Sequence, residues 1–327
     1  MRFLLMSGIG VTRNFVANIV KRIIRKKIRF DQSDILFRDY LARSLGVRSE
    51  LRITSRGLPN EGAGNQAHLT MLAINFARVL NIPYVHTPFT EIVHADRPME
   101  LWLRAWEAEF NLGVGEIPAK ISDHDALDFA KNNGSLIHRL GLRNIHQVFN
   151  ITYKHFREKY YSDKVPRLNP LLIVGVHVRR GDVSRDYTEM WTELRDIATT
   201  IAKIRNVLDK RAMKCRIRVF SEGNHSEFND LELLEVELFL NADPLWTMRE
   251  LIEADILVMA KSAFSYYAAI ISDGIKLYEP YDRLPPLEGW LVRQPTGDFD
   301  ERLFLMQLEA MYRSMNTSAT QREGCGK

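Results

Sequence analysis

The second half of the sequence alternates short apolar runs with stretches in which apolar residues recur every three or four positions. Leu171–Val178 is a continuous apolar run of the kind that lies buried on both faces of a parallel sheet. The same pattern predicts strands at Ile217–Phe220, Ile256–Met259 and Ile275–Tyr278, with helices at Glu189–Leu208, Met248–Ala254 and Phe264–Ile271 between the strands. Such alternation predicts a doubly wound parallel α/β sheet.

The first half of the sequence begins a comparable α/β unit. A short strand at Leu51–Ser55 is followed by a glycine-bearing loop, Gly57–Gln66, and then by apolar residues at helical spacing as far as Leu80. An extended run resumes at Pro83–Val85. Further helices are predicted at Met99–Leu112, Asp125–Leu140 and His146–Tyr160.

The domain organisation follows from length and from one proline-bearing segment. A chain of 327 residues favours about two domains, and Pro166 and Pro170 mark the boundary between them. The predicted segments are a basic N-terminal arm (1–48), an N-terminal α/β domain (49–165), a C-terminal α/β domain (166–298), a C-terminal helix (299–316) and a disordered tail (317–327).

The formal net charge of +4 is unevenly distributed along the chain. Residues 1–30 contain eight of the 45 Lys and Arg and no Asp or Glu, so the remaining 37 basic residues face all 41 acidic ones. A body this close to neutral lacks the basic face that nucleic-acid binding requires. We therefore expect no nucleic-acid partner.

The basic arm has an amphipathic pattern. Between Phe15 and Ile24, apolar residues recur at three- and four-residue spacing, with Lys and Arg among them. A helix of this kind binds an anionic membrane surface or packs on the protein core with a solvated basic face, and the pattern fits both equally. No run reaches the roughly twenty apolar residues that a membrane-spanning helix needs.

The two cysteines indicate the redox compartment. Cys215 and Cys325 lie far apart and offer neither a disulfide framework nor a metal-ligand spacing. A reducing compartment fits this usage best. We expect a cytoplasmic protein, with attachment of residues 1–30 to the inner face of a membrane as the alternative.

Polar motifs follow the predicted strands. Because ligands of open parallel sheets bind beyond the carboxyl ends of the strands, we expect these motifs to share a ligand site. They are Arg179-Arg180-Gly181-Asp182, Ser221-Glu222-Gly223, Lys261-Ser262-Ala263-Phe264-Ser265 and, in the first half, Gly62-Ala63-Gly64-Asn65-Gln66.

The chemistry of these motifs suits a pyrophosphate. Arg179 and Arg180 supply guanidinium forks that match phosphate oxygens, and Asp182 orients one of them or acts on the substrate. Ser262 is a candidate N-cap of a helix whose free N–H groups, in Ala263, Phe264 and Ser265, form an anion site. Gly62 and Gly64 allow close backbone approach to a ligand, with amide donors from Asn65 and Gln66. Together these features predict a cleft between two α/β domains.

Each motif also has a plainer interpretation. In these interpretations, the arginine pair is a surface pair that Asp182 and Asp186 neutralise. Gly62–Gly64 is then only a turn, and Ser262 is a helix cap that binds no ligand. His177, inside an apolar strand, is more often a hydrogen-bonded core histidine than a catalytic group.

These motifs resemble those of one enzyme family. Gly62–Gln66 resembles the Gly-x-Gly-Asn-Gln loop of alpha-1,2-fucosyltransferases, and His177–Asp182 is similar to their His-x-Arg-Arg-Gly-Asp motif, with relatives in alpha-1,6- and protein O-fucosyltransferases. Phe220–Glu222 looks like their Phe-Ser-Asp segment and Lys261–Ala269 like their Asn-Ser-Ser-Phe-Ser-Trp-Trp-x-Ala run. The motifs occur in the family's order.

The resemblance implies a GT-B-like fold, with an acceptor-side N-terminal domain and a C-terminal domain that binds the nucleotide sugar. It implies inverting, metal-independent transfer of fucose from GDP-fucose to a glycan acceptor, without a cofactor. Arg180 would neutralise charge on the leaving diphosphate, supported by Arg179 and the backbone of His177. We expect a metal-free site on the assumption that the chain lacks an Asp-x-Asp metal motif. Candidate general bases are Asp182, Glu222 and Glu61.

The sequence also departs from the family pattern. Some fifty residues precede the first loop, Ala263 replaces the family's second serine, Tyr266 and Tyr267 replace its tryptophan pair, and Lys261 replaces its asparagine. Three alternatives therefore stay open: a glycosyltransferase that uses another nucleotide sugar, a non-catalytic nucleotide- or glycan-binding protein of the same fold, and a structural domain tethered by the basic arm.

Overall fold

The computed structural model describes residues 51–80, 82–124, 126–131, 149–167, 171–186, 189–232 and 234–324. The expectations for residues 1–48 lie outside these ranges. The chain forms two compact units, unit 1 (residues 1–164) and unit 2 (residues 165–327), and each is described by itself. In the described residues no helix has the length and apolar character needed to cross a lipid bilayer.

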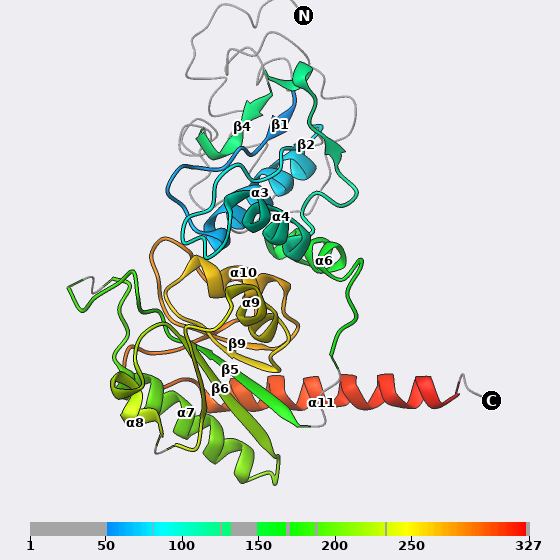
Figure 1. Ribbon diagram of the computed structural model, residues 1–327. Coiled ribbons are helices and arrows are strands. Elements are labelled where there is room, and N and C mark those ends of the chain that lie inside the picture. The colour runs from blue at the N-terminus through cyan, green and yellow to red at the C-terminus, as the bar shows by residue number, and fades with distance from the viewer. Residues whose placement is uncertain are drawn as a thin grey trace, which may run out of the picture. The chain divides into compact units, whose positions relative to one another are not determined.

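Unit 2 is built on a six-stranded, fully parallel sheet (Figure 1). Its strands are β5 (Leu172–His177), β6 (Cys215–Ser221), β7 (Glu237–Leu240), β8 (Ile256–Val258), β9 (Ile275–Tyr278) and β10 (Leu291–Val292). They lie in the order β10-β9-β8-β5-β6-β7. In chain order this is 6-5-4-1-2-3, the arrangement of doubly wound nucleotide-binding sheets. The predicted fold class is thus confirmed for unit 2 as a mixed α/β fold with a parallel sheet.

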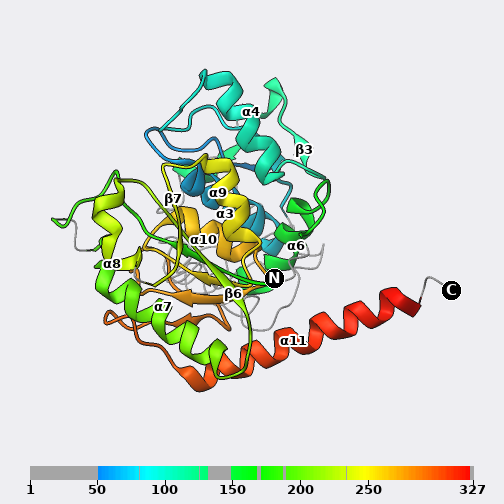
Figure 2. The ribbon, with the colours of Figure 1, turned by 60° about the horizontal axis from the view of Figure 1, so that its bottom comes forward.

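Helices cover both faces of this sheet, as Figures 1 and 2 show. Helices α7 (Leu194–Asp209) and α11 (Glu301–Gly324) pack on one face, where Val174 and Val176 of β5 are fully buried. On the other face lie α9 (Pro244–Ile252) and α10 (Ala263–Ile271). The short elements η3 (His225–Phe228) and α8 (Asn229–Glu232) follow β6.

A glycine brings α9 close to the central strand. A Cβ atom at Gly175 would lie 2.9 Å from the Cβ atom of Ala254 and 3.6 Å from a methyl carbon of Leu251. The helix itself begins with Asp243, whose carboxylate accepts a hydrogen bond from the Trp246 N–H at 2.9 Å, and with Pro244 in the first turn. The predicted helix Met248–Ala254 therefore begins earlier than expected, at Pro244, and its close approach to β5 depends on Gly175.

Unit 1 contains short parallel strands and several helices. Strand β1 (Ile53–Thr54) pairs with β4 (Leu127–Asp128), strand β2 (Val85–His86) pairs with β3 (Ile117–Pro118), and a bridge between Ile53 and Tyr84 links the two pairs. The helical elements are α3 (Ala63–Leu80), α4 (Met99–Phe110), η1 (Ile121–Asp123) and α6 (Phe149–Tyr160).

Several boundaries differ from the sequence-based prediction. The predicted helix Asp125–Leu140 is wrong at its start, where Leu127 donates its N–H to Arg52 O at 2.9 Å within a parallel ladder; residues 132–140 lie outside the described ranges. Pairing with a distant strand overrode the local periodicity. Helix α3 begins at Ala63, inside the predicted loop, and α7 begins at Leu194.

The C-terminal helix is longer than predicted. Helix α11 continues through Gly324, where the sequence predicted a disordered tail from residue 317. Strands β7 and β10 were not predicted. Strand β7 lies at one edge of the sheet and its residues are only partly buried, and β10 has two residues, so neither shows a full apolar run.

Candidate functional site

The strand order of unit 2 reverses between β5 and β8, which are neighbours in the sheet although β6 and β7 separate them in sequence. At such a reversal the connections leave in opposite directions and open a crevice beyond the carboxyl ends of the strands. The loops after β5 and β8 flank this point. Charged side chains at this edge follow five of the strands: Arg179 and Arg180 after β5, Glu222 after β6, Lys261 after β8, Glu279 after β9 and Arg293 after β10.

Arg179 is committed to protein partners. Its Nε and Nη2 donate to the two carboxylate oxygens of Asp182 at 3.1 and 2.7 Å, and its Nη1 donates to Lys261 O at 3.1 Å. Burial alone would lower the pKa of Arg179, but the hydrogen bond and charge of Asp182 raise it. Asp182 therefore orients Arg179, one of the two roles considered for it, and Arg179 ties the β5 loop to the β8 loop.

Arg180 is held quite differently. Only 5% of the residue is exposed, Nη1 donates to Arg179 O at 2.8 Å, and Nη2 donates to Thr192 O at 2.9 Å. Its guanidinium carbon lies 3.6 Å from the ring centroid of Trp191. Within the described residues, no carboxylate lies at ion-pair distance, and three of the five N–H groups have no protein acceptor.

The charge of Arg180 persists at neutral pH despite this burial. Burial lowers the pKa of Arg180 to about 10, partly offset by the carboxylates of Glu193 and Glu227 and assisted by the charge of Arg185. A nearly buried cation without a paired carboxylate is costly unless an anion compensates it. The geometry therefore singles out Arg180, not Arg179, as the arginine with donors left for a ligand.

His177 ends β5 beside the start of α10. Its ring lies 5.5 Å from that of Phe264, and its buried Nδ1 has no hydrogen-bond partner in the described part of the chain. Burial, with a further contribution from Arg179, lowers the pKa of His177 to about 4, so the imidazole is neutral at pH 7. The plainer interpretation of His177 as a hydrogen-bonded core histidine is therefore not met at Nδ1.

Helix α10 begins as the sequence predicted. The Ser262 hydroxyl accepts from the Phe264 N–H at 3.2 Å, which makes Ser262 the N-cap. Ser265 has a structural role: its hydroxyl donates to Ala260 O and accepts from Ala260 N, both at 3.2 Å, and it is fully buried. Ala263 and Phe264 stay partly exposed in the first turn, where helical N–H groups lack intrahelical acceptors.

Glu222 and the β5 loop lie against each other. Gly181 has a φ of +80°, and a Cβ atom there would lie 1.7 Å from Glu222 Oε2. Only glycine combines this backbone conformation with so close a neighbour. Ser221, at the end of β6, donates its hydroxyl to Val178 O at 2.8 Å and closes the same corner.

Behind Arg180 lies a buried polar network that the sequence analysis missed. Glu279 is 3% exposed; it accepts from the Thr192 hydroxyl at 2.6 Å, pairs with Lys261 Nζ at 3.3 Å, and pairs with the fully buried Arg293. Lys261 also donates to Trp191 O at 3.2 Å. The network therefore holds the Trp191–Thr192 segment, which in turn supports Arg180.

Only part of this network had a signal in the sequence. Glu279 directly follows a predicted strand, so a scan of all strand ends would have found it. Trp191 and Thr192 lie within the predicted helix Glu189–Leu208, and Arg293 follows a strand of two residues that shows no pattern.

The predicted residues of unit 1 cluster at the start of α3. Gly62 O accepts from the N–H groups of Asn65 and Gln66, both at 3.1 Å, and a Cβ atom at Gly62 would meet nothing within 4 Å. The Gln66 amide accepts from Leu58 N at 3.1 Å and donates to Leu58 O at 2.6 Å and Glu91 O at 3.1 Å. Gln66 thus fastens the loop, Gly62 directly precedes α3, and Gly64 and Asn65 lie in the first turn of that helix. Glu61, the third candidate base, accepts from Val93 N through its main-chain oxygen at 3.2 Å.

The assumption that the chain lacks an Asp-x-Asp motif is wrong. Asp123-His124-Asp125 and Asp298-Phe299-Asp300 both match that pattern. Asp123 pairs with Arg52, Asp298 pairs with Lys203, and Asp300 accepts from Leu303 N at 3.0 Å at the start of α11; Asp125 lies outside the described residues. The three described carboxylates therefore serve the fold. Across the described ranges, no group of three His, Cys, Asp or Glu is placed to hold a metal ion.

Fold and site together define unit 2 as a doubly wound α/β unit with a cationic site at the reversal of strand order. No protein-family model matches the sequence, and no curated protein matches it. A solved structure of POFUT1 in complex with GDP-fucose is similar at 14% identity, covering 69% of this chain and 94% of that chain, with a TM-score of 0.34. A likeness this remote carries nothing of that protein's activity to this chain.

Proposed function

We propose that this chain is a glycosyltransferase whose unit 2 binds a nucleoside diphosphate sugar at the carboxyl edge of its sheet. The observation that carries the proposal is Arg180: a cation that is 5% exposed, stacked on Trp191, and without a carboxylate partner in the described residues. A diphosphate supplies the missing negative charge and accepts the remaining N–H groups.

The surroundings of Arg180 support an anionic ligand. Helix α10 points its capped N-terminus to the same edge, and the positive end of a helix dipole favours phosphate. Lys261 and Arg293 both pair with the carboxylate of Glu279, which places two further cations at this edge. His177 is neutral and adds an unpaired ring nitrogen rather than a charge.

The same arrangement suits transfer rather than binding alone. When a glycosidic bond to a diphosphate breaks, negative charge grows on the leaving phosphate oxygens. A guanidinium already fixed by two carbonyls and an indole meets that charge without reorganising, which is the main source of electrostatic catalysis. Arg180 is therefore the residue to which we assign leaving-group stabilisation, with Arg179 and Asp182 holding the loop.

The finer parts of the proposal rest on the sequence motifs. GDP-fucose as donor, inversion at the anomeric carbon, metal independence and a glycan acceptor all follow from the resemblance of His177–Asp182 and Lys261–Ala269 to fucosyltransferase motifs. Glu222 remains the candidate base of unit 2, because Asp182 is engaged with Arg179. Membrane attachment through residues 1–30 stays a proposal from the basic amphipathic pattern alone.

The direct test is release of nucleotide from a panel of donors. The full-length protein is incubated with GDP-fucose, GDP-mannose, UDP-galactose and UDP-glucose, each with and without EDTA, and the free nucleoside diphosphate is measured. We expect release from GDP-fucose that survives EDTA. Release from a UDP-sugar alone would show that the donor is that sugar nucleotide and not GDP-fucose. Complete loss of release with EDTA, followed by recovery with manganese, would contradict metal independence.

A binding measurement separates a silent enzyme from a wrong site. A ligand that binds only the folded state raises the melting temperature, so GDP should raise it more than guanosine does. Equal shifts of the melting temperature from GDP and guanosine would rule out the proposed diphosphate site. A shift from GDP with no release from any donor would identify a non-catalytic nucleotide-binding protein.

A further inference from the structure

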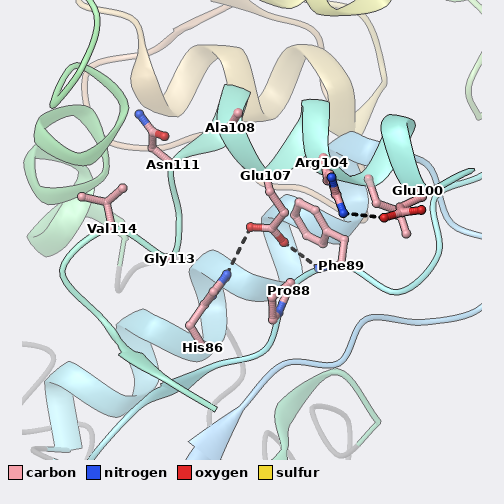
Figure 3. A pocket seen from close by; sticks show the side chains of 11 residues that line it. His86, Pro88, Phe89, Glu100, Arg104, Glu107, Ala108, Asn111, Gly113 and Val114 are labelled. Carbon is pink, nitrogen blue, oxygen red and sulfur yellow. Dashed lines mark hydrogen bonds and ion pairs between the residues drawn. The ribbon is translucent and has the colours of Figure 1, made fainter. Parts of the chain in front are cut away.

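A second candidate site lies wholly within unit 1. A hollow of about 670 Å³ opens between the end of β2 and helix α4 (Figure 3). Its volume lies in the range of small-molecule sites, which are mostly apolar with a few fixed polar groups. The residues that matter to its chemistry are His86, Phe89, Leu103, Arg104, Glu107 and Ala108.

The carboxylate of Glu107 is fixed at the wall of this hollow (Figure 3). Its Oε2 lies 3.1 Å from His86 Nε2, and its Oε1 accepts from the Phe89 N–H at 2.5 Å. The Tyr84 hydroxyl lies 3.4 Å from His86 Nδ1; when it donates there, Nε2 carries the ring proton and donates to Glu107. The Glu107 side chain is 21% exposed, so each oxygen keeps lone-pair capacity for a ligand.

The facing wall is also held in place. The loop after α4 lies so close to His86 that a Cβ atom at Gly113 would be 2.6 Å from the imidazole ring. Lys159 of α6, whose side chain is 4% exposed, fastens this loop by donating to Leu112 O at 3.2 Å and to Val114 O, and by pairing with Glu116 at 2.8 Å. A buried lysine with three oxygen partners fixes the backbone, and the hollow is therefore preformed.

The charges of the hollow select the class of ligand. Arg104 and Glu100 neutralise each other at the exposed rim, which leaves Glu107 as the unneutralised charge of the wall. An anionic ligand would place like charge beside Glu107, whereas hydroxyl groups would donate strong hydrogen bonds to it. Phe89 and Leu103 offer apolar surface for the carbon-bound hydrogens of a sugar ring.

We propose that this hollow binds a neutral saccharide, with Glu107 accepting a hydroxyl hydrogen bond. As the site of the glycan acceptor, it rests on the function proposed above; as a saccharide site, it stands on the geometry of unit 1 alone. Glu107 is then also a group able to accept the proton of a bound hydroxyl, beyond the candidates that the sequence suggested.

The test fills the hollow without touching its polar contacts. Ala108 is exposed on α4 and lines the hollow, so the side chain introduced by Ala108→Phe should occupy the hollow. The matched control is Leu101→Phe, because Leu101 is 55% exposed on the same helix and does not line the hollow. Saturation-transfer NMR on the full chain uses methyl β-galactopyranoside, methyl N-acetyl-β-glucosaminide and glucuronate as probes. Wild type and Leu101→Phe should transfer saturation to at least one neutral glycoside, and Ala108→Phe should weaken that binding at least tenfold. Glu107→Gln should weaken it about tenfold, as expected for losing a charge-assisted hydrogen bond.

The outcomes separate this site from the proposed function. No transfer to either neutral glycoside, unchanged binding in Ala108→Phe, or equal binding of glucuronate would overturn the proposal. The GDP melting shift is measured on the same variants and should not change. If glycosides bind through α4 while GDP does not bind, the saccharide site stands and the glycosyltransferase proposal fails; if GDP binds and the glycosides do not, the reverse holds.

Discussion

The guanidinium carbon of Arg180 lies 3.6 Å from the ring centroid of Trp191, so the indole covers one face of this cation. Such stacking contributes roughly 0.5–2 kcal/mol and leaves the in-plane N–H groups free to donate. Because Trp191 and Thr192 belong to the segment before α7, this contact joins the loop after β5 to the start of α7. The plane in which Arg180 presents its remaining donors is therefore set by Trp191.

Replacing Arg180 should affect turnover far more than folding. Arg180→Ala and Arg180→Lys should each lower the rate of nucleotide release at saturating donor by about a hundred- to a thousandfold, the usual cost of one preorganised donor. Lysine should recover little, because an ammonium keeps the charge but loses the planar fork. Rates are measured beside a melting curve for each variant.

The control for Arg180 lies in the same loop. Arg185 is 76% exposed and lies 5.9 Å from the Trp191 ring, so Arg185→Ala alters the local charge without touching the buried guanidinium. It should release nucleotide within about twofold of wild type, as expected for an exposed ion-pair residue. An Arg180→Lys variant that melts normally and works within a few-fold of wild type would remove Arg180 from the mechanism.

Thr192 should act as a positioning residue through Glu279. Thr192→Val removes the 2.6 Å hydrogen bond to Glu279 but leaves the main-chain oxygen that accepts from Arg180. We expect stability to fall by about 1 kcal/mol and the maximal rate to fall about tenfold with an unchanged KM, because the cation loses its rigid support. Thr199→Val, which removes an exposed hydroxyl of α7, should change neither the stability nor the maximal rate. A loss of stability without any loss of rate would make the network purely structural.

Two glycines should respond differently to alanine. Gly181→Ala meets a φ of +80° and a Cβ position 1.7 Å from Glu222 Oε2, so the loop or Glu222 must move. The backbone strain alone costs roughly 1–2 kcal/mol. Gly62→Ala meets nothing within 4 Å and should leave stability within about 0.5 kcal/mol of wild type. Urea unfolding of both variants checks this, and equal stabilities would contradict the geometry of the β5 loop.

His177 should make unfolding free energy depend on acid pH. Its folded pKa of about 4 lies below the unfolded value of 6.5, so the unfolded state binds more protons between these values and stability falls as pH falls from about 6.5 to 4. At pH 5 the loss is about 2 kcal/mol. Comparing wild type with His177→Gln at pH 7.5 and pH 5 isolates this share, since other groups cancel. Parallel losses in both proteins would show that the folded imidazole titrates normally.

The sequence located strands β5, β6, β8 and β9 of unit 2 and the motifs that follow β5, β6 and β8. A strand buried on both faces of a parallel sheet is predominantly apolar, and Leu171–Val178 shows that signature with His177 as its one polar side chain. Ser262 was found as a cap because capping depends on a residue and its immediate neighbours, and the Phe264 N–H donates to it as predicted.

Elements that depend on distant partners could not be predicted. Strand β4 and strand β10 have two residues each, and they exist only because β1 and β9 lie beside them. Glu279 and Arg293 form a buried pair although 14 positions separate them, and nothing local marks either residue as buried. Burial of a charge is decided by what packs around it, which a single sequence does not show.

The adjacent arginines show most sharply what each level decides. The sequence determined that two guanidinium groups and one nearby carboxylate follow the central strand, because the strand and its end are local features. It could not determine which arginine the carboxylate would neutralise, since the side chains are identical and neighbours in sequence. The turn at Gly181 and the Trp191–Thr192 segment determine the pairing. Asp182 pairs with Arg179, whereas Arg180 stacks on the Trp191 indole and keeps N–H donors for a ligand. Side chains that alternate in direction along an extended backbone meet different surroundings, and those surroundings are supplied only by tertiary packing.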